Sequence, residues 1–200
     1  MKKLLAAIFL VLLTTSLICL GIQAETKEET TPSLENSYTS DQEYIAAMAP
    51  IVDYNEPKYY TEEDILLLAR TAYCEGRGIP SKMELACVMW TVLNRVDCDW
   101  QNDFKDKNTI KEVVLQPKQF AYSESAPLVT DYGYDLYELA QDVLDRWSRE
   151  KNGDPDPGRV LPKEYLWYAS KGDGHNYFRT VYRGSNIVYW DYSLPNPYET

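Results

Sequence analysis

The first part of the chain carries two patterns that are not typical of a folded core. Residues 4–20 are apolar, they follow the basic start at residues 1–3, and the small residue Ala24 precedes an acidic run. This layout is typical of a secretory signal peptide, so we expect residues 1–24 to be removed and the mature protein to be secreted. An uncleaved apolar segment would instead anchor the chain in a membrane. Residues 25–57 are polar and rich in Glu, Thr, Ser and Pro, which predicts a spacer.

The hydrophobic pattern of the next hundred residues predicts four helices. Three of them begin at a capping sequence, in which Ser or Thr is followed three positions later by Asp or Glu, at Thr61, Ser81 and Thr109. The second helix is apolar on nearly all sides, which is typical of a central, buried helix, whereas the fourth has one apolar stripe. The predicted helices cover residues 61–76, 83–96, 109–115 and 134–148.

The last part of the chain is aromatic and β-branched, which predicts short strands. The segments 165–168, 177–182 and 187–192 have this composition, and residues 183–186 have the composition of a turn between the last two. Helices that come first and strands that come last indicate the α+β class. We therefore expect a single folded domain over residues 58–200.

Composition narrows the classes of function. The 200 residues include 31 acidic and 20 basic side chains, a net charge of −11, which argues against a nucleic-acid partner because phosphate binding needs a basic face. The chain has one histidine, and no ligand spacing implies a metal or another cofactor. Removal of residues 1–24 leaves Cys74, Cys87 and Cys98, an odd number, so their disulfide pairing stays open.

Glu75 is the residue that local chemistry singles out. It lies in the last turn of the first predicted helix, where the negative end of the helix dipole favours a protonated carboxyl group. Such a group can act as a general acid on a glycosidic oxygen, and Gly76 and Gly78 would leave room for a bulky substrate. From this pattern alone, a solvated glutamate at a helix end is the simpler interpretation.

Cys74 and His175 form a rival pair. A thiolate and an imidazole could make an amidase or peptidase site. Cys74 lies at the end of a predicted helix, however, and the start of a helix is the position that would favour a thiolate. A small core cysteine and a loop histidine are the simpler interpretation.

Five stretches of sequence, taken in order, are more specific than any one of them alone. They are Leu-Ala-Arg-Thr-Ala-Tyr-Cys-Glu-Gly-Arg-Gly at 68–78, the run at 86–96 that ends in Asn-Arg-Val, Thr-Ile-Lys-Glu-Val at 109–113, Gln-Pro-Lys-Gln-Phe at 116–120 and Gly-His-Asn-Tyr-Phe at 174–178. Together they resemble the SleB-type cell wall hydrolases, the spore cortex-lytic family of spore-forming bacteria. The resemblance covers residues 60–180, which is most of the expected domain.

This resemblance implies a lysozyme-like helical catalytic domain with a small C-terminal β region. It implies that peptidoglycan glycan strands are the substrate and that the enzyme, in the cell wall or the spore, cuts between N-acetylmuramic acid and N-acetylglucosamine as a lytic transglycosylase. Glu75 falls on the catalytic glutamate of the family. The implied substrate-binding residues are Gln119, Phe120, Tyr122, His175 and Phe178, and the implied structural supports of the Glu75 turn are Arg77 and Asn94.

Departures from the family pattern keep alternatives open. Cys74 precedes the glutamate, Ile79-Pro80 replaces a frequent acidic residue, and we expect residues 25–57 to be too short and polar for a peptidoglycan-binding module. Preference for spore cortex over vegetative wall therefore stays open, as does the need for an accessory protein. A hydrolase with a second carboxylate, from Glu124, Glu164 or Asp173, is one alternative. An inactive wall-binding protein and the Cys74/His175 amidase or peptidase are the others.

Overall fold

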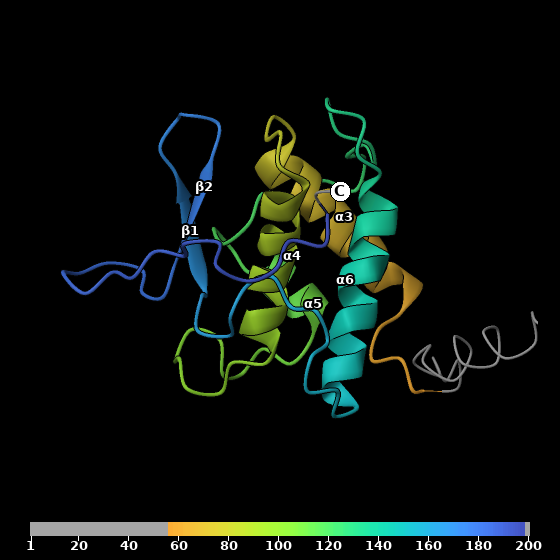
Figure 1. The fold of residues 1–200 in the computed structure, drawn as a ribbon, viewed down its shortest axis with the longest axis horizontal. Helices are drawn as coiled ribbons and strands as arrows, with labels where there is room; N and C mark the ends of the chain where they lie inside the picture. The colour runs from red at the N-terminus through yellow and green to blue at the C-terminus, as the bar shows by residue number, and fades with distance from the viewer. Residues whose placement is uncertain (1–55, 199–200) are drawn as a thin grey trace, which may run out of the picture. The chain divides into compact units, whose positions relative to one another are not determined.

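A computed structural model describes residues 56–198 of the chain (Figure 1). Within this range the helices are α3 (Glu62–Gly76), α4 (Lys82–Val96), α5 (Ile110–Val114) and α6 (Leu136–Lys151), and the strands are β1 (Trp167–Ser170) and β2 (Asn176–Arg179). The helices precede the strands, so the general α+β class is confirmed. The expected signal peptide and nearly all of the expected spacer lie outside the described residues.

Local capping explains where the helices begin. The predicted capping box of α3 is complete, because the Thr61 side chain accepts from the backbone of Asp64 and the Asp64 carboxylate accepts from the backbone of Thr61. The box expected at α4 is only half formed: Ser81 accepts from the backbone of Glu84, but the Glu84 carboxylate bonds elsewhere. Helix α6 begins two residues later than predicted, because the side chain of Asp135 caps it.

The core is built around α4, as its apolar pattern predicts. Every residue from 83 to 95 of this helix is buried, and α4 packs against α3, α5 and α6. Figure 1 shows α4 between the β1–β2 hairpin on one side and α6 on the other. Helix α6 contributes one apolar stripe, which includes Leu139, Val143 and Trp147. No helix in residues 56–198 is long and apolar enough to span a bilayer.

The sheet is smaller than the sequence pattern predicts. Strands β1 and β2 are antiparallel and pair Tyr168 with Phe178 and Ser170 with Asn176. The prediction of a strand at 187–192 is wrong, since this segment forms only an isolated bridge, between Arg179 and Tyr189. Tyr192 has a φ of 58°, which ends the extended backbone.

Candidate active site

Glu75 lies in a pocket of about 290 Å³ that joins two distant parts of the chain. The end of α3 and the turn after it form one wall, and the tip of the β1–β2 hairpin forms the other. The lining residues are Cys74, Glu75, Gly76, Arg77, Gly78, Ile79, Ser170, Gly174, His175 and Asn176. The structure therefore brings Glu75 and His175 to the same pocket, and Glu75 is the sole carboxylate among the lining residues of the described range.

The Glu75 side chain is held from behind by the loop after α5. Its Oε1 atom accepts a hydrogen bond from the backbone N–H of Ala121. The buried hydroxyl of Tyr168 lies near Glu75, but the two do not have the geometry of a hydrogen bond. This hydroxyl has no hydrogen-bond partner among residues 56–198. Burial raises the pKa of Tyr168 well above its usual range, and the charge of Glu75 adds to the shift. Tyr168 could not be predicted as a neighbour of Glu75, since nothing in the strand pattern separates it from a core tyrosine.

Arg95 is a buried cation that organises the same region. It is 3% exposed, and burial lowers its pKa to about 10, so the guanidinium stays charged at neutral pH. Its Nε donates to the Leu166 carbonyl at 2.8 Å, and its Nη1 donates to Gln119 Oε1 at 3.1 Å. The guanidinium carbon lies 4.7 Å from the centre of the Phe104 ring and 4.5 Å from that of Phe120. The Arg95 side chain thus fastens both the segment before β1 and the loop after α5 to helix α4.

The loop residues that the resemblance implies as substrate contacts lie beside the Glu75 pocket and do not line it. The side-chain oxygen of Gln119 is engaged by Arg95, and the ring of Phe120 packs between Arg95 and Tyr168. Tyr122 is half-buried against the core. Ala121, which binds Glu75 through its backbone, is the direct link from this loop to the carboxylate.

The expectation that Phe178 contacts the substrate requires a correction. It is 1% exposed and packs against Tyr168 with ring centres 5.5 Å apart, so it belongs to the core and does not line the pocket. The cause is the alternation of a strand: in β2, Asn176 and Phe178 face the interior, while Tyr177 and Arg179 are partly exposed.

The two expected structural supports differ. Asn94 is buried, and its Nδ2 donates to the carbonyls of Pro162 at 2.8 Å and Tyr165 at 3.0 Å, so it fastens α4 to the segment that leads into β1. Arg77 is exposed, and its side chain has no hydrogen bond or ion pair with residues 56–198. It closes α3 only through its backbone N–H, which donates to the Tyr73 carbonyl.

Gly76 allows α3 and α4 to approach each other beside Glu75. A Cβ atom at this position would lie 2.6 Å from Leu85 Cδ2 and 3.3 Å from Ile79 Cδ1, whereas a Cβ atom at Gly78 would meet nothing within 4 Å. The room expected at both glycines therefore exists only at Gly78. At Gly76 the space is filled by the buried side chain of Leu85.

We expect Gly76→Ala to lower the free energy of unfolding by about 1–2 kcal/mol. Overpacking a filled core costs about 1–3 kcal/mol, and the better helix propensity of alanine offsets up to about 1 kcal/mol of it. Urea unfolding followed by circular dichroism measures the change. Gly78→Ala is the matched control and should change stability by less than about 0.5 kcal/mol. Equal stability of the two variants would contradict this account.

His175 is oriented by Glu84, a residue that the sequence analysis treated only as part of a helix cap. The Nδ1 atom of His175 lies 2.7 Å from Glu84 Oε1, and the backbone N–H of Asn176 donates to Glu84 Oε2 at 2.9 Å. An acidic residue within the mostly apolar run of α4 is the signal that could have identified it.

Cys74 and His175 line the same pocket, but they form no hydrogen bond with each other. Cys74 is half-buried at the end of α3, and Cys87 and Cys98 are buried. All three are free thiols, so no disulfide joins these cysteines.

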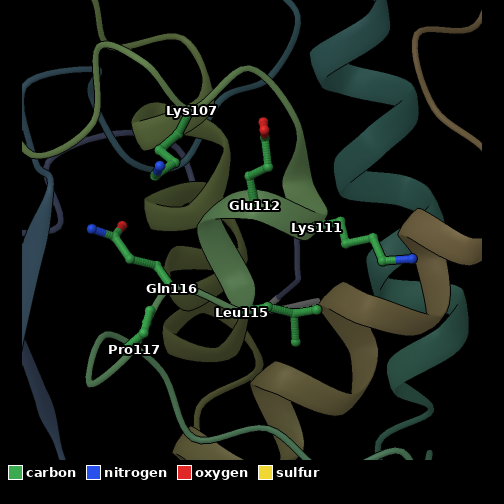
Figure 2. Close-up of a pocket in the computed structure, with 6 residues that line it drawn as sticks. All are labelled: Lys107, Lys111, Glu112, Leu115, Gln116 and Pro117. Carbon is green, nitrogen blue, oxygen red and sulfur yellow. The ribbon is translucent and has the colours of Figure 1, made fainter.

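A second pocket, of about 540 Å³, lies on the outer side of α5 (Figure 2). Two of its charged side chains are exposed and already engaged: Lys111 forms an ion pair with Glu63 at 2.8 Å, and Glu112 accepts from the backbone of Asn108. None of its lining residues belongs to the Glu75 pocket. We therefore place the candidate site at the smaller pocket, which holds a carboxylate, an imidazole and a buried glutamate behind it.

No known protein family, curated protein or solved structure matches this chain. Within residues 56–198, no three or more His, Cys, Asp or Glu side chains are grouped as metal ligands. What the site does must therefore be argued from its own geometry and from the motifs that lead to it.

Proposed function

We propose that this chain is a secreted lytic transglycosylase that cleaves peptidoglycan between N-acetylmuramic acid and N-acetylglucosamine, with Glu75 as its catalytic residue. The observation that carries the proposal is a single carboxylate, Glu75, at a helix end in a pocket whose opposite wall is the tip of a small antiparallel hairpin. A lysozyme-like domain, which the motifs imply, would hold its catalytic acid in this kind of position. The signal-like N-terminus supports action outside the cytoplasm.

One carboxyl group suffices for the proposed reaction. Because Oε1 of Glu75 accepts from the backbone of Ala121, the transferable proton belongs on Oε2. Glu75 gives this proton to the glycosidic oxygen as the C1–O bond breaks, and N-acetylglucosamine leaves as an alcohol. The carboxylate then takes the proton of the muramic 6-hydroxyl while that oxygen bonds to C1. The product is a 1,6-anhydro end, no water is consumed, and Glu75 is protonated again.

The hydrogen bonds and the exposure of the other carboxylates favour this scheme over hydrolysis with two carboxylates. Glycosidases of that kind place their two carboxyl groups about 5–9.5 Å apart across the scissile bond. Glu84 is buried with both oxygens engaged, and Asp173 accepts from the backbone of His175 and from the Tyr177 hydroxyl. Glu124 and Glu164 are exposed and lie outside the lining of the pocket.

Mass spectrometry of the released fragments tests the proposal. The mature protein would be incubated with purified vegetative wall and with spore cortex, and we expect muropeptides with anhydromuramic ends. Fragments with reducing ends would overturn the transglycosylase step and favour a two-carboxylate hydrolase. The absence of fragments from both substrates would favour a wall-binding role.

The same experiment distinguishes the proposed glycosidic cleavage from the Cys74/His175 amidase or peptidase. That alternative stays open because both residues line the Glu75 pocket. We expect Cys74→Ala to release the same anhydro products as the parent within about threefold in rate, because the proposed chemistry uses no thiol. Peptide or amide cleavage that disappears in Cys74→Ala would instead assign the pocket to a cysteine nucleophile.

A further inference from the structure

Glu84 is a buried carboxylate whose one cationic partner in the described range is a histidine. Its side chain is 6% exposed, and it forms no ion pair with a lysine or arginine of residues 56–198. An isolated buried carboxylate is costly unless it is paired and hydrogen-bonded. His175 Nδ1 and the Asn176 backbone N–H satisfy one oxygen each, and they come from a segment about ninety residues further along the chain.

This arrangement determines how the His175 ring is presented. A carboxylate only accepts hydrogen bonds, so Nδ1 must carry a proton when Glu84 is ionised. The other ring nitrogen, Nε2, has no partner among the described residues, and the His175 side chain is 53% exposed where it lines the Glu75 pocket. The ring is therefore anchored on one side and free to bind a ligand on the other.

The charges around His175 come from every element that surrounds it. Helix α4 contributes Glu84, α3 and its turn contribute Glu75 and Arg77 to the same pocket, and the β1–β2 hairpin contributes Lys171, Asp173 and Tyr177. From the C-terminal segment, the Tyr192 hydroxyl donates to the Asn176 carbonyl at 3.1 Å. The hydrogen bond to Glu84, then the charge of Glu84, and to a lesser extent Asp173, raise the pKa of His175.

We infer that Glu84 is a positioning residue that keeps a proton on Nδ1 of His175 and favours the imidazolium form of the ring, in which Nε2–H is directed to the Glu75 pocket. There Nε2–H offers a charged hydrogen-bond donor to an oxygen of the bound glycan, and this last step rests on the proposed function. The pocket thus contains one group that transfers a proton, Glu75, and one that fixes the substrate, His175.

The pair also links stability to pH. Because the pKa of His175 is raised in the folded protein, the stabilisation from the pair is fully present below the unfolded-state pKa of the imidazole. It is lost as the pH rises through the folded-state pKa.

The single histidine of the chain allows a direct test by NMR. The ring ¹⁵N and ¹H signals of the mature protein would be followed against pH in the parent, in Glu84→Gln and in Asp173→Asn. In Glu84→Gln the amide oxygen can still accept from Asn176, but the NH₂ group then faces Nδ1, which must lose its proton. We expect the parent to titrate above the ordinary value for histidine, Glu84→Gln to titrate at clearly lower pH, and Asp173→Asn to move less.

Steady-state kinetics on solubilised glycan strands at pH 7 gives the second readout. We expect Glu84→Gln to raise KM about tenfold and to change kcat by less than about threefold, because a charged hydrogen bond to bound substrate becomes a neutral one. A merely structural role would lower kcat and stability together and leave the ring tautomer unchanged.

Three results would overturn the inference. They are equal titration of the parent and Glu84→Gln, an Nδ1 without a proton in the parent at neutral pH, and an unchanged KM in a variant whose titration has moved. The parent signals alone decide the tautomer if Glu84→Gln fails to fold. If the parent releases no glycan fragment, the proposed function fails and the glycan role falls with it, while the NMR titration still decides whether Glu84 holds His175.

Discussion

Glu75→Gln should lower kcat for release of anhydro-muropeptides by about 10³-fold, because general acid–base catalysis contributes about 10²–10⁴-fold and this variant cannot transfer a proton. The amide oxygen of glutamine can still accept from the backbone N–H of Ala121, so the loop after α5 should stay in place. We expect the thermal midpoint and the affinity for glycan strands to be nearly unchanged. The measurement is the initial rate of fragment release at saturating substrate, together with thermal unfolding of both proteins.

Glu124→Gln is the matched control for this variant. It removes the same charge from an exposed position in the segment that follows the Gln-Pro-Lys-Gln-Phe motif, outside the lining of the pocket. We expect its kcat to stay within about twofold of the parent, since a surface substitution away from the site has a small effect. A Glu75→Gln protein that is as active as Glu124→Gln would rule out Glu75 as the acid.

The parts of the fold that depend on neighbours in the sequence could be predicted. The capping box at Thr61 and the apolar run of α4 determine where these helices lie, because both act within one or two turns of the chain. The motif around Glu75 could be recognised for the same reason, because its residues are neighbours in the sequence. His175 could be placed beside it only through the family resemblance, since about a hundred residues separate the two.

The features that the sequence analysis missed depend on tertiary contacts. Glu84 matches a capping box locally, and only the arrival of the β1–β2 hairpin turns its carboxylate toward His175. Phe178 matches a pocket residue in the motif, but the register of β2 directs it into the core. The strand expected at 187–192 has the right composition, yet it finds only one bridge with β2, because β-propensity depends on the partner that is available.

Arg95→Lys should have the second large effect, this time on stability and activity together. The planar guanidinium binds the Leu166 carbonyl and Gln119 at once and lies against the rings of Phe104 and Phe120. A lysine ammonium cannot reproduce this fork or its stacking. Because a buried carbonyl would lose its donor, we expect a loss of about 2–3 kcal/mol in the free energy of unfolding, measured in urea.

The rate of catalysis should fall as well. Arg95 binds Gln119, and Ala121, two residues further along the same loop, binds the carboxylate of Glu75. A small displacement of a catalytic group can cost about 10²-fold in rate, so we expect kcat/KM to fall by at least about tenfold at a temperature where the variant is folded. Arg77→Lys is the control: its side chain is exposed and unpaired within residues 56–198, and it should change stability by less than about 0.5 kcal/mol.

A double-mutant cycle of Arg95→Lys with Gln119→Ala isolates the link to the loop. Additive losses of activity in that cycle would mean that Arg95 supports the fold but does not position Glu75.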